Sequence, residues 1–249
     1  MSRLEYGEDT VELLKRLGNI KDDTLDVSHL KINSLPELPT TIKKLHCSYT
    51  QLEYLPALPE CLEVLDCMSV PLKELPRLPS NLKKMYCYYT NIQILPHLPP
   101  NLEALYCCFN ESLHTIRNFS DSLKIIWCYH NPKLETIPEL PSKLEELSCH
   151  TTPISSLPGL TYLSNKLKKL VCSNTNIKRL PVYFPDSIEI LSCPKSCLEA
   201  MFGLPKNLKQ VWCNGYLVIY KSKEIEIIKN MSMFDEETDD YKIALIRRL

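Results

Sequence analysis

The sequence predicts an α/β solenoid, a stack of short copies of one structural repeat. Three observations predict it. Nine cysteines recur at intervals of 20, 20, 20, 21, 21, 23, 21 and 20 residues, and apolar residues keep fixed places around each of them. Prolines recur between the copies, and the chain holds 19 Pro but only 5 Gly. The cysteines, called the cysteine ladder below, are Cys47, Cys67, Cys87, Cys107, Cys128, Cys149, Cys172, Cys193 and Cys213.

Each copy has the same internal frame. A leucine-like residue lies five and two positions before the cysteine, as Leu62 and Leu65 do before Cys67. Another follows five positions after it, and a fourth, eight after it, usually precedes proline. This is the leucine-rich-repeat pattern L-x-x-L-x-C-x-x-[N/T]-x-L-x-x-L-P. A degenerate copy opens at Leu25 and the last decays after Asn214, so we expect about nine to ten repeats.

Elementary strand geometry turns this frame into a horseshoe. In an L-x-C segment, alternate side chains point to opposite faces, so Leu and Cys face inward and the residue between them faces out. Each repeat therefore adds one short strand to a parallel, concave sheet. The return segments read L-P-x-L-P in several copies, such as 35–39 and 55–59. Proline favours extended, polyproline-like backbone, so we expect an extended convex side.

The two ends of the chain are expected to be short helical caps, because terminal repeats must shield the apolar ends of the stack. We divide the chain into an N-terminal, partly helical cap at 1–24, a solenoid at 25–218 and a C-terminal, partly helical cap at 219–249. The first helix is expected near 9–17, with Asp9 or Thr10 as its N-cap and Gly18 as its stop. The second is expected near 236–247.

Composition limits the function. The net charge of −1 lacks the basic excess of a nucleic-acid binder. No run of 18 apolar residues is present, so no membrane span is expected. The first 20 residues lack the apolar core of a secretory signal, which favours a reducing, cytoplasmic location with free thiols and leaves open export by another route.

The run from Leu55 to Cys87, LPALPECLEVLDCMSVPLKELPRLPSNLKKMYC, resembles the LPX-type repeats of bacterial effectors such as IpaH and YopM. Similar repeats occur in proteins of large DNA viruses that infect amoebae. The resemblance covers about residues 25–218 and implies binding of host proteins, which would place the chain in a host cytoplasm. Some effectors add a ubiquitin-ligase domain with a Cys-x-Asp motif. This chain has no Cys-x-Asp and only 36 residues after Cys213, so ligase activity is not expected.

The cysteine ladder could suggest a metal or redox site, but its geometry favours a buried core. Structural zinc needs four converging ligands, whereas successive repeats would present sulfur atoms in a straight file. Parallel side-chain directions also disfavour disulfides. Cys108 lies next to the ladder and is expected to face outward as the most exposed thiol. We find no catalytic motif, and we expect no cofactor, no metal and no enzymatic activity.

A charge pattern occupies the position after the first leucine of each repeat. Its sign alternates in every copy, which should place each lysine between two glutamates on neighbouring strands. Its main expected role is structural, through register, and a polar binding strip is the alternative. The residues, called the charge ladder below, are Lys43, Glu63, Lys83, Glu103, Lys124, Glu145, Lys168, Glu189 and Lys209.

Aromatic residues gather at outward positions in three consecutive repeats. The positions beside the ladder cysteines carry five of them, and Tyr49, Tyr89 and Phe109 lie one position further along. Exposed aromatic clusters often mark binding sites, although stacking of the rings along the sheet would also explain them. The predicted partner-binding residues are Tyr86, Tyr88, Tyr106, Trp127, Tyr129, Tyr89 and Phe109.

Together these features predict a non-catalytic protein–protein interaction module that binds an unidentified protein through its concave face. One alternative is a structural or assembly protein, for example a viral component that associates with its own copies. Another is a substrate-recruiting subunit for an enzyme on a separate chain. We do not expect this chain to bind nucleic acid or a membrane.

Overall fold

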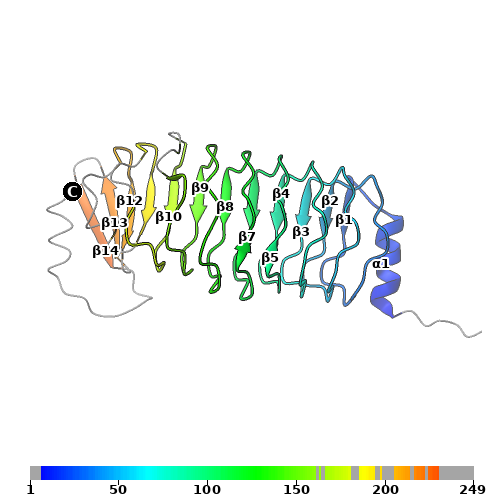
Figure 1. Cartoon of the computed structure of the whole chain (residues 1–249). Helices are drawn as coiled ribbons and strands as arrows, with labels where there is room; N and C mark the ends of the chain where they lie inside the picture. Colours follow the sequence, from blue (N-terminus) through cyan, green and yellow to red (C-terminus); the bar gives the residue numbers. More distant parts are fainter. Residues whose placement is uncertain are drawn as a thin grey trace, which may run out of the picture.

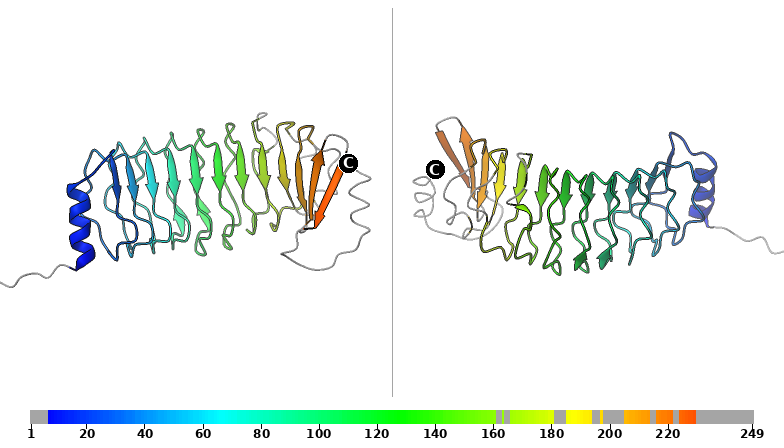
Figure 2. Two further views of the ribbon diagram at one scale, coloured as in Figure 1. Left: turned by 180° about the vertical axis from the view of Figure 1, so that it is seen from behind. Right: turned by 45° about the horizontal axis from the view of Figure 1, so that its top comes forward.

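The computed structural model describes residues 7–160, 163, 166–180, 185–193, 197, 205–213, 216–221 and 224–229. Its main feature is one long sheet that winds along the molecule, with a helix at its N-terminal end (Figure 1). The two further views show the same gently curved row of strands from other sides (Figure 2). The predicted solenoid with a parallel sheet is confirmed.

Ten short parallel strands form the body of the sheet, in chain order apart from two strands that belong to a second sheet. Every successive pair is in register at the same position of the repeat, for example Leu45 opposite Leu65 and Leu65 opposite Met85. The ten strands are β1 (Thr24–Asp26), β2 (Lys44–His46), β3 (Val64–Asp66), β4 (Lys84–Tyr86), β6 (Ala104–Tyr106), β8 (Ile125–Trp127), β9 (Glu146–Ser148), β10 (Lys169–Val171), β11 (Ile190–Ser192) and β12 (Gln210–Cys213).

The return segments are extended, as their prolines predicted. From β1 to β9 they contain no α-helix. Two of them pair as β5 (Ile94–Leu95) and β7 (Thr115–Ile116), a small parallel sheet on the opposite side of the solenoid. A repeat of about 20 residues leaves too little chain for a convex helix after its strand and its two proline-rich turns.

The N-terminal helix α1 (Glu8–Gly18) packs against β1 and buries Leu13. It ends at Gly18 as expected, but the predicted N-cap was wrong. The N-cap residue is Gly7, and no side chain caps the helix. Asp9 instead lies in the first turn, where its negative charge favours the helix dipole, and lysine and arginine lie in the last turn.

Two antiparallel strands, β13 (Tyr216–Lys221) and β14 (Glu224–Lys229), continue the sheet beyond β12. The boundary we expected at 218/219 therefore falls inside β13. The helix expected near 236–247 lies outside the described residues.

The core lies between the sheet and the return segments. The inward leucines and the ladder cysteines that the structure describes are fully or almost fully buried, as the alternation predicted. Burial raises the pKa of the Cys47 thiol to about 12 and that of Cys67 well above its ordinary value. Thiols are therefore protonated there. The Sγ of Cys47 donates to the carbonyl oxygen of Asp66 at 3.3 Å.

A buried polar file runs beside the cysteines, three positions after most of them, and Val70 takes that place after Cys67. Asn110 Nδ2 donates to the carbonyl oxygens of Cys87 at 2.9 Å and of Cys107 at 3.0 Å. Asn131 repeats the arrangement one repeat later, with the carbonyls of Cys107 and Cys128. These bonds satisfy backbone groups at the turn that follows the strand, which explains why Asn or Thr recurs at this position.

Candidate functional site on the exposed sheet face

The outward side chains of the ten parallel strands, together with the residues just after them, form what we call the exposed sheet face. The charge ladder borders it. Lys83 Nζ lies 2.8 Å from Glu63 Oε2, and Lys209 Nζ lies 2.7 Å from Glu189 Oε2. Each ladder lysine contacts the acid of the preceding repeat rather than both neighbours. Asp23, which the sequence pattern missed, begins the series by pairing with Lys43 at 2.8 Å.

These ion pairs are solvent-exposed on both partners, so each contributes only tenths of a kcal/mol. Hydrogen bonding to Lys83 lowers the pKa of Glu63, and hydrogen bonding to Asp23 raises the pKa of Lys43. Each pair thus holds its two charges at neutral pH. The strip has no net charge of either sign and offers no focused site for a charged ligand.

The seven predicted binding residues form one connected group of rings, which we call the aromatic cluster. Tyr86 and Tyr106 stack with their ring centres 4.7 Å apart, and Trp127 meets Tyr106 edge-on at 5.1 Å. Trp127 links this half to the second half through Tyr129, with ring centres 6.3 Å apart. In the second half, Phe109 stacks on Tyr89 at 4.6 Å and meets Tyr129 edge-on at 5.3 Å. Tyr88 joins through Tyr89. The register of β4, β6 and β8 brings these residues together.

Stacking and exposure coexist in the cluster. Tyr89 is 53 % exposed, whereas the other six rings are partly buried against one another. Our expectation that all of them project into solvent is therefore met only in part, and the stacking along the sheet that we kept as the alternative does occur. The Nε1 of Trp127 is buried and, within the described structure, has no hydrogen-bond partner.

Two histidines and a lysine extend the cluster, and sequence analysis did not assign them to it. His130 stacks on Phe109 at 4.6 Å, and His150 stacks on Tyr129 at 4.5 Å. Lys169 Nζ lies 5.6 Å from the centre of the Trp127 ring. Burial, with His130 and Lys169 nearby, lowers the pKa of His150 to about 4, so its ring is neutral at pH 7. Each histidine lies one repeat after the ring on which it stacks, and that spacing was the signal that could have found the two histidines.

The prediction for Cys108 was wrong. Cys108 is only 2 % exposed, and burial raises the pKa of its thiol to about 12. It does lie on the outer face of the sheet, but the larger side chains at the same position of the adjacent repeats, Tyr88 and Tyr129, surround it. Its thiol interacts with Tyr129. The least buried thiol among the described cysteines is Cys61.

A column of left-handed residues borders the carboxyl ends of the strands, two positions after each cysteine. Backbone in this region is uncommon for residues other than glycine and is unfavourable for aromatic and β-branched ones. Here φ lies between 51° and 65° in every described repeat from the first to the eighth. The residues, called the left-handed column below, are His29, Tyr49, Ser69, Tyr89, Phe109, His130, Thr151 and Asn174.

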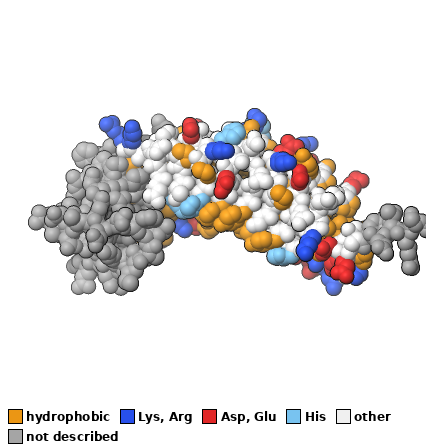
Figure 3. All heavy atoms as spheres, turned by 90° about the horizontal axis from the view of Figure 1, so that it is seen from below, with side chains coloured by type: hydrophobic (Ala, Val, Ile, Leu, Met, Phe, Trp, Pro, Cys, Tyr) orange, Lys and Arg blue, Asp and Glu red, His pale blue; other side chains and the backbone are white. Residues whose placement is uncertain are grey.

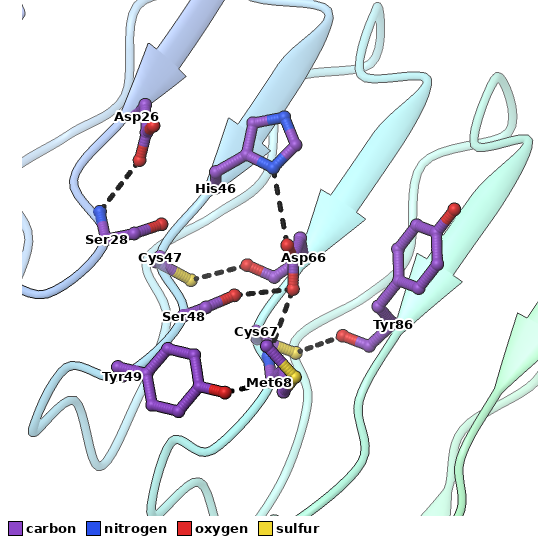
Figure 4. A network of polar contacts seen from close by, with 10 residues as sticks. All are labelled: Asp26, Ser28, His46, Cys47, Ser48, Tyr49, Asp66, Cys67, Met68 and Tyr86. Atoms are coloured by element: carbon purple, nitrogen blue, oxygen red, sulfur yellow. Dashed lines mark hydrogen bonds and ion pairs between the residues drawn. The ribbon is translucent and has the colours of Figure 1, made fainter.

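A polar network lies on the N-terminal side of the aromatic cluster (Figure 4). Asp66 is its centre. One carboxylate oxygen accepts the hydroxyl of Ser48 at 2.6 Å and the backbone N–H of Met68 at 3.2 Å, and the other lies 3.4 Å from His46 Nδ1. The hydroxyl of Tyr49 points toward the sulfur of Met68 at 3.8 Å. The hydrogen bonds fix the Asp66 carboxylate in place at the end of β3.

Neither metal chemistry nor a membrane span is indicated in the part of the chain that the structure describes. No three or more His, Cys, Asp or Glu side chains there are placed to hold a metal ion. No described helix is long and apolar enough to cross a membrane.

Three of the solved structures with a similar fold come from Yersinia and Shigella. YopM from Yersinia enterocolitica WA-314 has a TM-score of 0.64 and 26 % identity, over 84 % of this chain and 51 % of its own. The leucine-rich-repeat domain of a Shigella effector has a TM-score of 0.61 and 29 % identity, over 68 % of this chain and 79 % of that domain. YopM from Yersinia pestis, at 24 % identity and a TM-score of 0.61, shows the fold alone.

The chain spans 51 % and 65 % of the two YopM chains, less than two thirds of each. No protein-family model matches it, and no curated protein matches it. The repeat frame, the ten parallel strands and the structural likeness agree with one another. The chain is a leucine-rich-repeat protein that resembles the repeat regions of bacterial effectors.

Proposed function

We propose that this protein is a non-catalytic interaction module that binds a protein partner through the exposed, concave face of its sheet. The observation that carries the proposal is the aromatic cluster: large, rigid rings that remain partly exposed in the middle of a regular sheet. Such rings remove apolar area from water at low entropic cost, and binding hot spots are enriched in Trp and Tyr.

The surroundings of the cluster support the same function. Lys84 is exposed on β4 and Glu146 is partly exposed on β9, so charged side chains border the apolar centre. Charges at such a border tune orientation and association rate more than affinity. The similar solved structures are effector repeat domains, which also favours a protein partner. A reducing compartment, such as the cytoplasm of a host cell, suits a chain in which the ladder cysteines from Cys47 to Cys172 are buried and form no disulfide.

The test is affinity capture on three immobilised proteins, with the bound proteins measured quantitatively. Trp127→Ala removes the central ring of the cluster. Trp212→Ala is the matched control, because Trp212 has the same place in its repeat but lies in β12, away from the cluster. A partner of this face is captured by the wild type and by Trp212→Ala and is lost with Trp127→Ala.

Calorimetry then gives the size of the effect. Trp127→Ala should weaken binding of the captured partner by at least about 2 kcal/mol if the indole is a hot spot. Unchanged affinity together with a large fall in melting temperature would show that Trp127 serves packing. The buried Nε1 of Trp127 is the reason to test this outcome. Concentration-dependent self-association in light scattering would favour the assembly alternative. A captured partner with catalytic machinery would favour the substrate-recruiting one.

A further inference from the structure

The left-handed column contains a gap between two aromatic stacks. His29 stacks on Tyr49 with ring centres 4.8 Å apart, and two repeats later Tyr89 stacks on Phe109 at 4.6 Å. Between these two stacks lies Ser69, whose side chain has no ring. Its φ of 55° matches the 58° of Tyr49 and the 57° of Tyr89, so the backbone of the column continues through the gap unchanged.

Ser69 supplies no ring to stack on either tyrosine; the neighbours there are Tyr88, which meets Tyr89 edge-on at 6.2 Å, and Met68, whose sulfur lies 3.8 Å from the Tyr49 hydroxyl. The only described ring that stacks on Tyr49 is His29, and the only one that stacks on Tyr89 is Phe109. Accordingly Tyr49 is 51 % and Tyr89 is 53 % exposed, whereas Phe109, which has a ring on each side, is partly buried. Figure 3 shows hydrophobic and histidine side chains in a row along one side of the molecule.

The width of the gap suits one flat group. Neighbouring strands lie about 4.8 Å apart, so rings two strands apart are separated by about 9.6 Å. The observed stacks of the column are 4.6–4.8 Å apart. One planar group between Tyr49 and Tyr89 would therefore stack on both rings at the spacing that the rest of the column already uses. We call this gap, bounded by Tyr49, Ser69 and Tyr89, the tyrosine slot.

The charge beside the slot is negative. Asp66 ends β3, three residues before Ser69, and its carboxylate is held by Ser48 and Met68 (Figure 4). Burial raises the pKa of the nearby Tyr88, and the negative charge of Asp66 raises it further, so these two groups act on one another across this surface. Lys44 and Lys84 lie at the opposite ends of their strands from the slot.

We propose that the tyrosine slot binds the guanidinium group of an arginine side chain from the protein partner, which stacks between Tyr49 and Tyr89 with Asp66 as its counter-charge. The proposal deepens the proposed function and rests on it, because the arginine belongs to the partner of the same face. Guanidinium is planar, stacks on aromatic faces and is weakly hydrated, whereas the lysine ammonium is a compact, strongly hydrated charge. The thioether of Met68 is flexible and can move aside at the hydroxyl end of Tyr49.

The experiment fills the slot. Capped tripeptides Gly-Arg-Gly, Gly-Lys-Gly and Gly-Phe-Gly are titrated into the full chain and followed by the tyrosine ring signals in NMR. We expect the arginine peptide to bind most tightly. Ser69→Tyr should weaken it at least about fivefold by closing the stack, because it removes contact with both rings. Ser69→Ala, which leaves the slot open, should keep the wild-type affinity.

Two further measurements decide between explanations. Ser69→Tyr should keep or raise the melting temperature, because both neighbours already carry tyrosine at the same φ. Asp66→Asn should weaken the arginine peptide but leave the phenylalanine peptide unchanged. Equal binding of the phenylalanine and arginine peptides would overturn the guanidinium assignment, and full arginine binding by Ser69→Tyr would overturn the slot itself.

Failure of the slot and failure of the proposed function are distinguishable. Trp127 lies in β8, beyond β4 and β6 from the slot, so Trp127→Ala should leave the arginine-peptide affinity unchanged. If partner capture depends on Trp127 but not on Ser69→Tyr, the binding face stands without the slot. If Ser69→Tyr weakens binding of the arginine peptide while capture of no partner depends on Trp127, the slot binds arginine. The partner-binding surface is then centred on the slot and not on the aromatic cluster.

Discussion

The two faces of the same strands differ in how strictly they repeat. On the inner face, Leu45, Leu65 and Leu105 occupy one position from repeat to repeat, and Met85 is the only change among these four. On the outer face, the position one residue further along is His46, then Asp66, then Tyr86. Packing constrains the first face, because every side chain there touches its own equivalents. The second face varies with little effect on packing, and this is where binding specificity can reside.

The outer face is not exposed everywhere. Cys108 and Ser148 point outward, yet both are buried, because large neighbours on the same face cover them. His150 is neutral at pH 7 because the rings around it exclude water. The aromatic cluster has thus formed a second, small core on the outer face. If this second core excludes water, thiol labelling and the dependence of stability on pH should both show it.

The largest expected contrast is in thiol reactivity. Only the thiolate reacts, and a fully buried thiol must first be exposed by local opening. Cys61, partly exposed, should therefore react first with a thiol reagent, at least about a hundredfold faster than Cys87 or Cys107 in the folded protein. Cys108 should react with the slow group. Mass spectrometry after timed labelling measures the order, and fast labelling of Cys108 would mean that the aromatic rings do not cover it.

The next contrast is in core stability. Leu105 is fully buried in β6, so Leu105→Ala should lower the free energy of unfolding by about 2–5 kcal/mol through lost burial and the cavity left behind. Urea denaturation followed by circular dichroism measures the change. A loss well under 1 kcal/mol would contradict the inward position that the alternation predicted for this residue.

Protonation of His150 should destabilise the fold by a smaller amount. Its folded pKa of about 4 lies below the ordinary value near 6.5, so the unfolded chain takes up the proton first as the pH falls. Stability from this residue is therefore fully present above about pH 6.5 and is lost toward pH 4. Because the ring is only partly buried, we expect a loss on the order of 1–2 kcal/mol.

His150→Gln tests this directly, since glutamine does not titrate. Its stability should change less between pH 6.5 and pH 4 than that of the wild type, measured by urea denaturation at both values. His97→Gln, at an exposed histidine of a return segment, controls for the loss of one imidazole. If both variants keep the wild-type dependence on pH, the rings around His150 admit water and do not act as a core.

Much of the fold and of the aromatic cluster could be predicted from the sequence. With a period of about 20 residues, an assignment made in one repeat can be compared with the equivalent position in the next. The strands, the buried cysteines, the extended return segments and the contacts within the aromatic cluster all follow from one frame repeated along the chain. The burial of Cys108 does not follow from it. That burial depends on the sizes of Tyr88 and Tyr129 in the adjacent repeats, and alternation alone assigns only the direction of a side chain.

The left-handed column was missed for a related reason. Tyr49 and Thr151 are residue types that rarely adopt positive φ, so no local preference marks them. The turn geometry recurs at the same position of each repeat, even at His29 and Ser69, which are followed by Leu30 and Val70 rather than by Asn or Thr. Only a comparison of equivalent positions across repeats reveals that His29, Tyr49 and Tyr89 belong to one column. The N-cap at Gly7 was missed because it uses no side chain.

The smallest expected effect concerns the charge ladder. Glu103 pairs with Lys124 at 2.9 Å, and both side chains are nearly half exposed. Water and salt screen such a pair, so Glu103→Ala should lower the free energy of unfolding by less than about 1 kcal/mol, and by less still in 1 M salt. Leu105→Ala, two residues away on the other face of the same repeat, is the matched comparison under identical denaturation conditions. Register is the role that remains for the ladder, because a slip by one repeat would place lysine against lysine along the whole strip. A double variant that exchanges the charges, Glu103→Lys with Lys124→Glu, should therefore cost more than Glu103→Ala. The exchanged residue at 103 then faces the like charge of Lys83 in the preceding repeat, and the one at 124 faces that of Glu145 in the following repeat. Equal costs would show that the alternation is not needed for the stack.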